Sequence, residues 1–219
     1  MRSGPRVLLA ASFLAGCASA PPPGGSPAER IETRARLLRA EETRTYNAEL
    51  FGRGAASPDP EIRRQTALSA GRLREASAGA LLPRLLADPD PAVRRAAAFA
   101  AGLSGDRSLV AALSAALADA DPGSAANAAD ALGKLGGPEA EAALLSALER
   151  PSPVRAAAAL ALWRAPSPET LRSLSAIAVN PAAPAETRRA AVYSLSRRPK
   201  TEGQAALRAV LRRKESREA

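Results

Sequence analysis

The sequence predicts an all-α protein in which about five pairs of helices stack into a column. Its apolar residues, 46% of a 219-residue chain, are chiefly Ala, Leu and Val, and aromatic residues make up only 3%. Runs of Val, Ile and Thr that favour strands are missing. Two markers recur every 31 residues: Pro60, Pro91, Pro122, Pro153 and Pro184, and Leu86, Leu117, Leu148 and Val179. This tandem period predicts an α-solenoid, because a single unit cannot bury its apolar face alone.

Residues 1–16 have the layout of a secretory signal peptide. Two arginines precede an apolar run from Val7 to Leu14, which is too short to span a bilayer as a helix. The segment LAGC that ends at Cys17 resembles the lipobox of bacterial lipoproteins. The resemblance implies cleavage before Cys17 and acylation of that residue. A buried free thiol behind an ordinary signal peptide is the alternative.

The residues after Cys17 give the expected location. Ala18 is not the aspartate associated with retention in the inner membrane, so the lipoprotein resemblance implies the outer membrane of a bacterial cell envelope, facing the periplasm. Residues 17–27 are rich in proline and glycine, and we expect them to form a flexible tether behind the lipid anchor.

Residues 28–56 are predicted to form an N-terminal capping helix. Ile31, Leu38, Tyr46 and Leu50 can lie along one side of it, and most of the other residues are charged. A polar outer face is what the open end of a solenoid requires.

Residues 57–213 are the repeat array, and each unit is predicted to be a helical hairpin. In the stretch DPDPAVRRAAAFAAG, Asp90 suits an N-cap, Pro91 the first helical position, and Gly102 the end of the helix. Apolar spacing predicts first helices at 61–72, 92–102, 123–134, 154–164 and 185–196, and second helices at 78–87, 108–118, 138–149, 168–179 and 202–213.

The later units depart from this pattern. The third has Ala125 where the arginine is expected, and the fourth lacks one residue after Pro153 and carries Trp163 near the glycine position. The fifth has Ala183 in place of the aspartate, so we expect it to act as a C-terminal cap. Residues 214–219 are predicted to be a basic tail.

The repeated motif is D-P-x-V-R-x-x-A-x-x-A-L-G, present as Asp90, Pro91, Val93, Arg94, Ala97 and Gly102. It resembles the short bacterial HEAT-like repeats first associated with phycobilin lyases. The resemblance implies an α–α superhelix of the armadillo and HEAT type over about residues 57–213. It is specific for fold and weak for function, because HEAT arrays serve many unrelated proteins.

Two sets of charged residues recur with the repeat: the arginines Arg63, Arg94, Arg155 and Arg188, and the aspartates Asp59, Asp90 and Asp121. We predict a structural ladder in which arginine bridges aspartate and carbonyl groups of the next unit. A basic ligand-binding stripe is the alternative.

The outward side of the second helices is the candidate partner-binding surface, because the HEAT resemblance implies that it lines the concave face. It would present Arg84, Ser114, Ser146, Arg172 and Arg208. Plain solvated surface is the alternative. Trp163, the only tryptophan, either fills the gap left by the missing residue or contacts the partner. Phe99 and Tyr193 are predicted to be structural residues of the core.

The chain has no histidine and a single cysteine, so the commonest metal ligand and proton shuttle is absent. We therefore expect no catalytic activity, no metal and no cofactor. Deoxyhypusine hydroxylase, a related family, holds iron with His-Glu pairs, and that chemistry does not transfer to a chain without histidine. The few aromatic residues argue against the tetrapyrrole pocket of phycobilin lyases.

These expectations add up to a lipid-anchored, monomeric scaffold that binds a protein or peptide partner. The formal net charge of +9 attracts polyanions, but the export signal argues against nucleic acid. Two alternatives remain open. One is a truncated or stand-alone accessory module of a HEAT-containing enzyme, either bilin-lyase-like or of the exported kind followed by a prolyl isomerase domain. The other is a binder of an anionic envelope polymer.

Overall fold

A computed structural model describes residues 26–151, 153–165, 167–198, 203–205, 207–209 and 211–212. The predicted signal peptide, the predicted lipidation site Cys17, nearly all of the predicted tether and the predicted basic tail lie outside the described residues. Within the described residues there is no strand, and no helix is long and apolar enough to cross a membrane.

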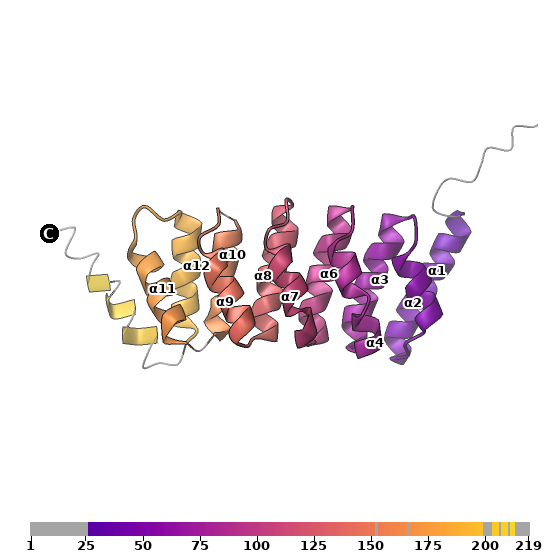
Figure 1. Cartoon of the computed structure of the whole chain (residues 1–219), viewed down its shortest axis with the longest axis horizontal. Coiled ribbons are helices and arrows are strands. Elements are labelled where there is room, and N and C mark those ends of the chain that lie inside the picture. Colours follow the sequence, from indigo (N-terminus) through magenta and orange to yellow (C-terminus); the bar gives the residue numbers. More distant parts are fainter. Residues whose placement is uncertain are drawn as a thin grey trace, which may run out of the picture.

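The predicted all-α solenoid is confirmed (Figure 1). The helices are α1 (Pro27–Thr43), α2 (Ala48–Ala55), α3 (Pro60–Leu73), α4 (Ala76–Gly79), α5 (Leu82–Leu86), α6 (Pro91–Ser104), α7 (Val110–Ala116), α8 (Pro122–Leu135), α9 (Pro138–Ala147), α10 (Val154–Ala161), α11 (Pro168–Val179) and α12 (Ala185–Ser196). Two short 3₁₀ helices, η1 (Arg107–Leu109) and η2 (Leu162–Arg164), adjoin α7 and α10.

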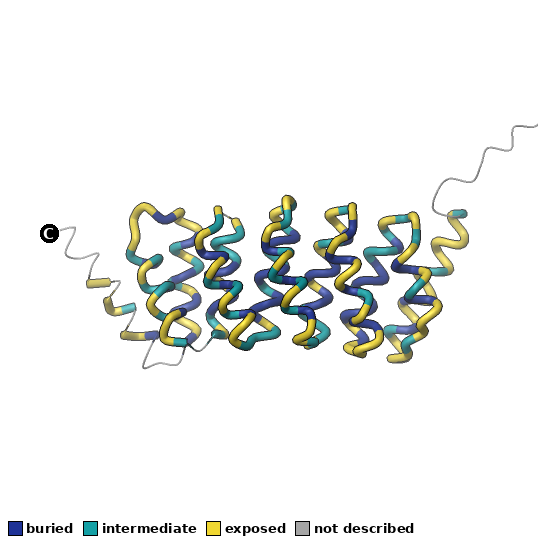
Figure 2. Tube along the Cα trace, in the orientation of Figure 1, coloured by how far each residue is buried: buried dark blue, intermediate teal, exposed yellow. Residues whose placement is uncertain are grey.

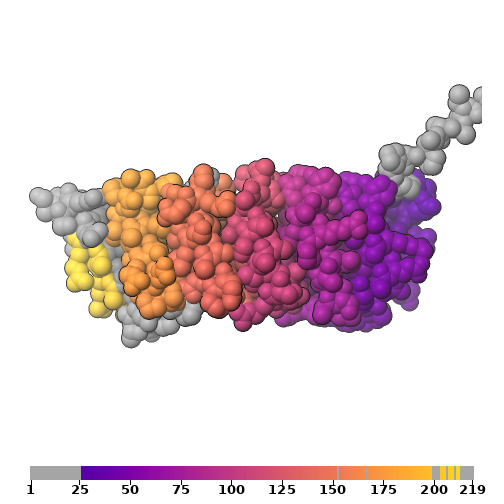
Figure 3. Space-filling view, in the orientation of Figure 1, coloured from indigo at the N-terminus to yellow at the C-terminus, as the bar shows by residue number. Residues whose placement is uncertain are grey.

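The helices form two layers. The first helices of successive units, α1, α3, α6, α8, α10 and α12, each pack on the next, and α2, α5, α7, α9 and α11 form the second layer. Figure 3 shows the colours of the chain following one another in slabs, and the main contacts between helices join each unit to its neighbours along the chain. The buried residues run along the middle of the column (Figure 2).

The start signals of the first helices are confirmed. Asp59, Asp90 and Asp121 are N-caps in extended conformation, each followed by a proline in the first turn. The Asp90 side chain accepts a hydrogen bond from the Ala92 backbone N–H at 2.7 Å. A helix therefore begins at the same place in three successive units.

Gly102 does not end α6, contrary to the prediction. The helix continues to Ser104 and ends at Gly105, which takes the left-handed conformation with φ of 74°. A Cβ on Gly102 would lie 3.0 Å from the Cα of Ala131 in α8, and one on Gly71 would lie 2.6 Å from the Cα of Ala100 in α6. These glycines are needed because neighbouring first helices approach more closely there than a side chain allows.

The N-terminal cap is a hairpin of α1 and α2, not the single helix predicted for residues 28–56. The turn forms because Arg44 adopts a left-handed conformation with φ of 53°, and the Asn47 side chain then caps α2 through the Leu50 N–H at 2.8 Å. Glu41 joins this hairpin to α3 by accepting hydrogen bonds from the Ser69 hydroxyl at 2.5 Å and from Arg72 at 2.8 Å.

The buried face of α1 also differs from the prediction. Leu37 and Ala40 are buried, whereas Ile31 and Leu38 are 69% and 48% exposed. The reason is that α1 packs against the column on one side only, and Ile31 and Leu38 lie on the other side. Leu50 is buried as expected.

Candidate functional site

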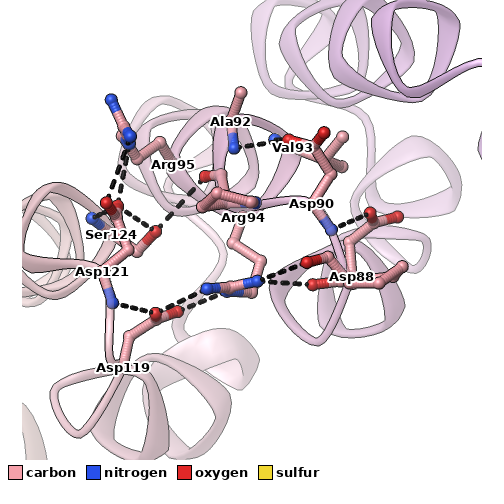
Figure 4. Close-up of polar contacts among 11 residues, drawn as sticks. Asp88, Asp90, Ala92, Val93, Arg94, Arg95, Asp119, Asp121 and Ser124 are labelled. Atoms are coloured by element: carbon pink, nitrogen blue, oxygen red, sulfur yellow. Dashed lines mark hydrogen bonds and ion pairs between the residues drawn. The ribbon is translucent and has the colours of Figure 1, made fainter.

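Charged residues that recur with the repeat form a ladder between successive units, and Figure 4 shows the rung made by Arg94. Arg94 donates from Nε and Nη2 to the Asp119 carboxylate at 2.6 and 2.8 Å, and from Nη1 to the carbonyl of Asp88 at 2.9 Å. Arg63 makes the same set of contacts with the Asp88 carboxylate, at 2.7 and 2.8 Å, and with the Ser57 carbonyl at 2.9 Å. Each arginine therefore ties the loop of its own unit to the loop of the next.

The aspartates of this ladder are not the predicted ones. Asp88 and Asp119 hold the arginines, whereas Asp59, Asp90 and Asp121 cap helices. The physical reason is that an N-cap carboxylate is already turned toward the N–H groups of its own helix. Asp121 and Asp59 do contact the preceding unit, but through Arg95 and Arg30 and not through the predicted arginines. Arg63 and Arg94 pair instead with the carboxylate two residues before the next N-cap.

The two ladder carboxylates are held ionised. The hydrogen bond from Arg94 lowers the pKa of Asp119, and it outweighs burial, which raises that pKa. Burial raises the pKa of Asp88, but the hydrogen bonds from Arg63 and from the Asp90 N–H together bring it below its ordinary value. Both rungs are thus ion pairs near neutral pH.

The ladder is interrupted in the C-terminal half. The third unit has Ala125 at the arginine position and Arg150 at the aspartate position. In the fourth unit the residue that corresponds to Asp88 is Asn180, whose Oδ1 accepts from the Ala182 N–H at 3.0 Å as Asp88 accepts from the Asp90 N–H at 2.9 Å.

Asn180 leaves the fourth rung without a carboxylate. An amide side chain has a single acceptor oxygen, so it cannot take the two parallel hydrogen bonds by which Asp88 and Asp119 hold Arg63 and Arg94. The Nε of Arg155 is accordingly buried without a hydrogen-bond partner among the described residues. Arg188, in the fifth unit, donates to backbone carbonyls at Pro181 (3.1 Å) and Ala183, so this arginine does structural work at its own loop.

A hollow of about 540 Å³ opens on the outer side of the first helices, where α8, α10 and α12 adjoin. It is lined by Ala126, Asn127, Asp130, Ala157, Leu160, Ala161, Trp163, Arg164 and Tyr193. Leu160 and Tyr193 are 45% and 50% exposed. Three successive units contribute apolar side chains to one surface, which we call the α8–α12 hollow.

Phe99 and Tyr193 are not core residues, contrary to the prediction. Phe99 is 39% exposed and Tyr193 is half exposed. Both lie five residues after the ladder arginine of their unit, a position that faces away from the second layer. Alanines such as Ala97 and Ala100 fill the space between the helices and leave no room for a ring.

Trp163 stands at the edge of the hollow, half-buried. The Arg164 guanidinium carbon lies 4.5 Å from its ring centroid, and that of Arg197, the C-cap residue of α12, lies 5.0 Å away. Trp163 occupies the position that Gly133 holds in the previous unit, where even a Cβ would lie 2.9 Å from Ala161. Because an indole cannot fit there, the regular helix α10 ends early and Trp163 lies in η2.

The next unit compensates for this early helix end. Side chains of the last unit satisfy backbone carbonyls that the 3₁₀ turn leaves open. The Ser194 hydroxyl donates to the carbonyls of Ala159 at 2.6 Å and Leu160 at 3.1 Å, and Arg198 donates to the Ala165 carbonyl at 2.6 Å. The wall of the hollow is therefore fixed by hydrogen bonds and not only by packing.

A second, smaller cavity of about 280 Å³ lies beside the hollow and shares Ala161 and Arg164 with it. Its polar group is Glu141, which accepts hydrogen bonds from Ser167 and, at 2.5 Å, from the buried hydroxyl of Thr170. These contacts join α9 to α11, so Glu141 serves the packing of the two units.

None of the residues predicted to bind a partner on the second helices lines the α8–α12 hollow or the smaller cavity beside it. Arg84, Ser146, Arg172 and Arg208 are exposed, and the half-buried Ser114 donates to the Val110 carbonyl at 2.8 Å. Trp163 alone of the predicted set lines the hollow. Reasoning from sequence missed Leu160 and Tyr193. These two residues could have been found from the repeat, because each lies five residues after the recurring arginine of its unit, as Phe99 does.

No group of three or more Cys, Asp or Glu side chains that could hold a metal ion occurs in the described part of the chain. The ionisable residues near the hollow pair with one another instead. The Asp130 carboxylate lies 2.6 Å from Lys134 Nζ and 3.8 Å from Arg164 Nη1. The residues that line the hollow therefore offer an apolar surface with charged groups beside it.

Comparisons with known proteins found one family model that matches and solved structures that are similar to this chain. A family model described as HEAT repeats matches residues 78–163. The complex of CpcE and CpcF of phycocyanin lyase from Nostoc sp. PCC7120 is similar in structure, with a TM-score of 0.51 and 22% identity, over 86% of this chain and 81% of that chain. Human deoxyhypusine hydroxylase in complex with glycerol matches with a TM-score of 0.38 and 17% identity, over 84% of this chain and 92% of that chain.

Comparison with curated protein sequences found no match. The family model and the phycocyanin lyase complex support a HEAT-like repeat protein with an α-solenoid fold. A likeness at these identities concerns the fold.

Proposed function

We propose that this protein is a non-catalytic scaffold that binds a protein or peptide partner on the outer side of its first helices. The observation that carries the proposal is the α8–α12 hollow, where Leu160, Trp163 and Tyr193 expose apolar surface from neighbouring units. Exposed aromatic side chains around a concave apolar floor are typical of binding sites. Rows of stacked repeats provide such surfaces without any need for a catalytic group.

The proposal also includes a lipid anchor at Cys17 in the bacterial envelope. It rests on the arginines, the short apolar run and the lipobox-like segment of residues 1–17, followed by a Pro- and Gly-rich tether. Two or more acyl chains hold a protein at a membrane durably, whereas one does not. The scaffold would then present its partner at the membrane surface.

Site-specific photo-cross-linking tests the binding surface. A photoreactive residue at Leu160 in the producing cells should give a discrete adduct with one partner, and the matched position Arg172 on α11 should not. The Tyr193→Ser variant should weaken the adduct formed from Leu160. An adduct from Arg172 alone would instead support the surface predicted from the second helices.

The anchor is tested separately by partition into detergent. We expect the mature protein to enter the detergent phase and the Cys17→Ala variant to remain in the aqueous phase after export. Equal solubility of the two exported forms would remove the lipoprotein part of the proposal and leave the binding surface unaffected.

A further inference from the structure

We infer that the α8–α12 hollow takes an acidic peptide segment that inserts one large apolar side chain. This inference rests on the proposed function and adds the chemical class of the partner. Two features of the hollow carry it: an apolar floor that fits a side chain, and a rim on which three cations, Lys134, Arg164 and Arg197, share the single carboxylate of Asp130.

The floor and walls define the apolar part of the ligand. Ala126, Ala157 and Ala161 form a floor without long side chains, and Leu160 and Tyr193 stand beside it. A volume of about 540 Å³ is within the range of ligand pockets and exceeds what one aromatic ring needs. An apolar side chain with its flanking backbone therefore fits, and the exposed leucine and tyrosine would be covered.

The rim defines the charge of the ligand. Asp130 is the only carboxylate among the lining residues, and Lys134 and Arg164 already lie within ion-pair distance of it. Arg197 is exposed, stacks on Trp163 and forms no ion pair with any described residue. The local balance is positive, so carboxylates beside the inserted side chain complement it.

The geometry of Trp163 keeps these cations in place. Guanidinium groups held over an aromatic ring lose less conformational freedom on binding a carboxylate than free side chains do. Arg164 lies in η2 and Arg197 is the C-cap residue of α12, so a carboxylate that contacts both would also join the fourth and fifth units of the column.

Selection from a randomised peptide display library on the immobilised full chain tests the inference. Enriched peptides should combine several Asp or Glu residues with a Phe, Leu or Trp. For a synthetic enriched peptide that lacks tryptophan, saturable binding should change the emission of Trp163, because it is the only tryptophan in the chain. Replacing the acidic residues of that peptide by lysine should weaken binding about tenfold or more.

Variants locate the binding. Arg164→Gln and Arg197→Gln should each weaken the peptide about threefold to tenfold, and Leu160→Ser by about tenfold. The matched controls are Arg172→Gln, an exposed arginine on α11, and Leu38→Ser, an exposed leucine on α1 outside the hollow. Both controls should bind as the parent does, and circular dichroism should show the same helix content for all variants.

Several outcomes would overturn the inference. They are enrichment of basic or proline-rich peptides, binding that survives Leu160→Ser and Arg164→Gln, the absence of any enriched peptide, and a dimer in solution that Leu160→Ser dissociates. A partner cross-linked from Leu160 whose binding is indifferent to the two arginines would sink the acidic-segment inference and leave the scaffold function standing. If Leu160 also gave no cross-linked partner, both the acidic-segment inference and the scaffold function would fall.

Discussion

At the residue scale, the ladder shows how one arginine can hold two units together. Arg63 makes a bidentate ion pair with Asp88 and also donates to carbonyl groups of its own loop, with little of either side chain exposed. Pairs held this way matter more than surface pairs, because removing one partner leaves the other buried and uncompensated. The exposed pair of Lys134 and Asp130 is of the weaker kind.

Asp88→Asn should therefore destabilise the protein by about 2 kcal/mol at pH 7. The pKa of Asp88 is lowered in the folded state, so its contribution is complete above the unfolded pKa of about 3.9 and is lost as the pH falls through the lower folded value. Urea unfolding at pH 7 and pH 3 should show the variant and parent converging in acid. The control Asp130→Asn should change stability by less than about 1 kcal/mol. A gap between parent and Asp88→Asn that stays constant with pH would contradict this account.

The rung of Arg155 lacks a carboxylate, so supplying one should raise the stability of the protein. Asn180→Asp gives the buried Nε of Arg155 a carboxylate while keeping an acceptor for the Ala182 N–H, so stability should rise by about 1–2 kcal/mol. Thermal or urea unfolding measures it. Asn180→Ser, which cannot form the bidentate pair, is the control and should not stabilise. No gain with aspartate would show that the arginine lies out of reach of this position.

At the element scale, close contact between first helices sets the spacing of the column. Gly71 and Gly102 face the backbone of the next first helix, and alanines fill the remaining interface. In the fourth unit Trp163 cannot repeat this contact, and the helix ends in a 3₁₀ turn. The presence of tryptophan at the glycine position of the fourth unit thus interrupts the regular packing and also places an aromatic ring at the hollow.

Gly71→Ala tests this role. The added Cβ would lie 2.6 Å from the Cα of Ala100, so α3 and α6 must separate, at a cost of about 1–3 kcal/mol. Gly52→Ala in α2 is the matched control, because nothing lies within 4 Å of its Cβ and alanine favours a helix by up to about 1 kcal/mol. Urea unfolding of the two variants should shift in opposite directions. A neutral Gly71→Ala would mean that the helices tolerate a wider spacing.

Much of the helix arrangement could be predicted from the sequence. The period, the Asp-Pro starts and the alanine interfaces depend on local preferences, and they gave the fold and the N-caps. The partner of Arg94 could not be predicted with the same rules, because two aspartates flank each loop and only the path of the chain decides which of them Arg94 reaches. The turn at Arg44 was missed since no glycine marks it. The outward position of Phe99 and Tyr193 depends on how tightly the helices pack.

At the scale of the whole molecule, the two halves of the column are held differently. The N-terminal half contains the rungs of Arg63 and Arg94, whereas the C-terminal half has Ala125 and the unpaired Arg155 Nε. The stability of a solenoid is approximately a sum over units and their neighbour contacts. Local opening should therefore be easier around α10 than around α3, although each is one unit from an end.

Hydrogen exchange followed by mass spectrometry measures this difference. Backbone amides of α10 should exchange faster than those of α3, and Asn180→Asp should slow exchange in α10 while leaving α3 unchanged. Equal protection of the two helices, or faster exchange in α3, would show that the arginine–aspartate pairs do not make the N-terminal half more stable.

The nearest-neighbour contacts allow the protein to be lengthened by whole modules. A second copy of residues 91–121 inserted after Asp121 would bring its own Arg94 and Asp119, and the original Gly102 would meet a new Ala100 as Gly71 does now. Both new junctions would repeat geometries that already exist in the chain. Each inserted module should extend the column by about 8–10 Å, the usual separation of packed helices, so the distance between its two ends becomes an adjustable length.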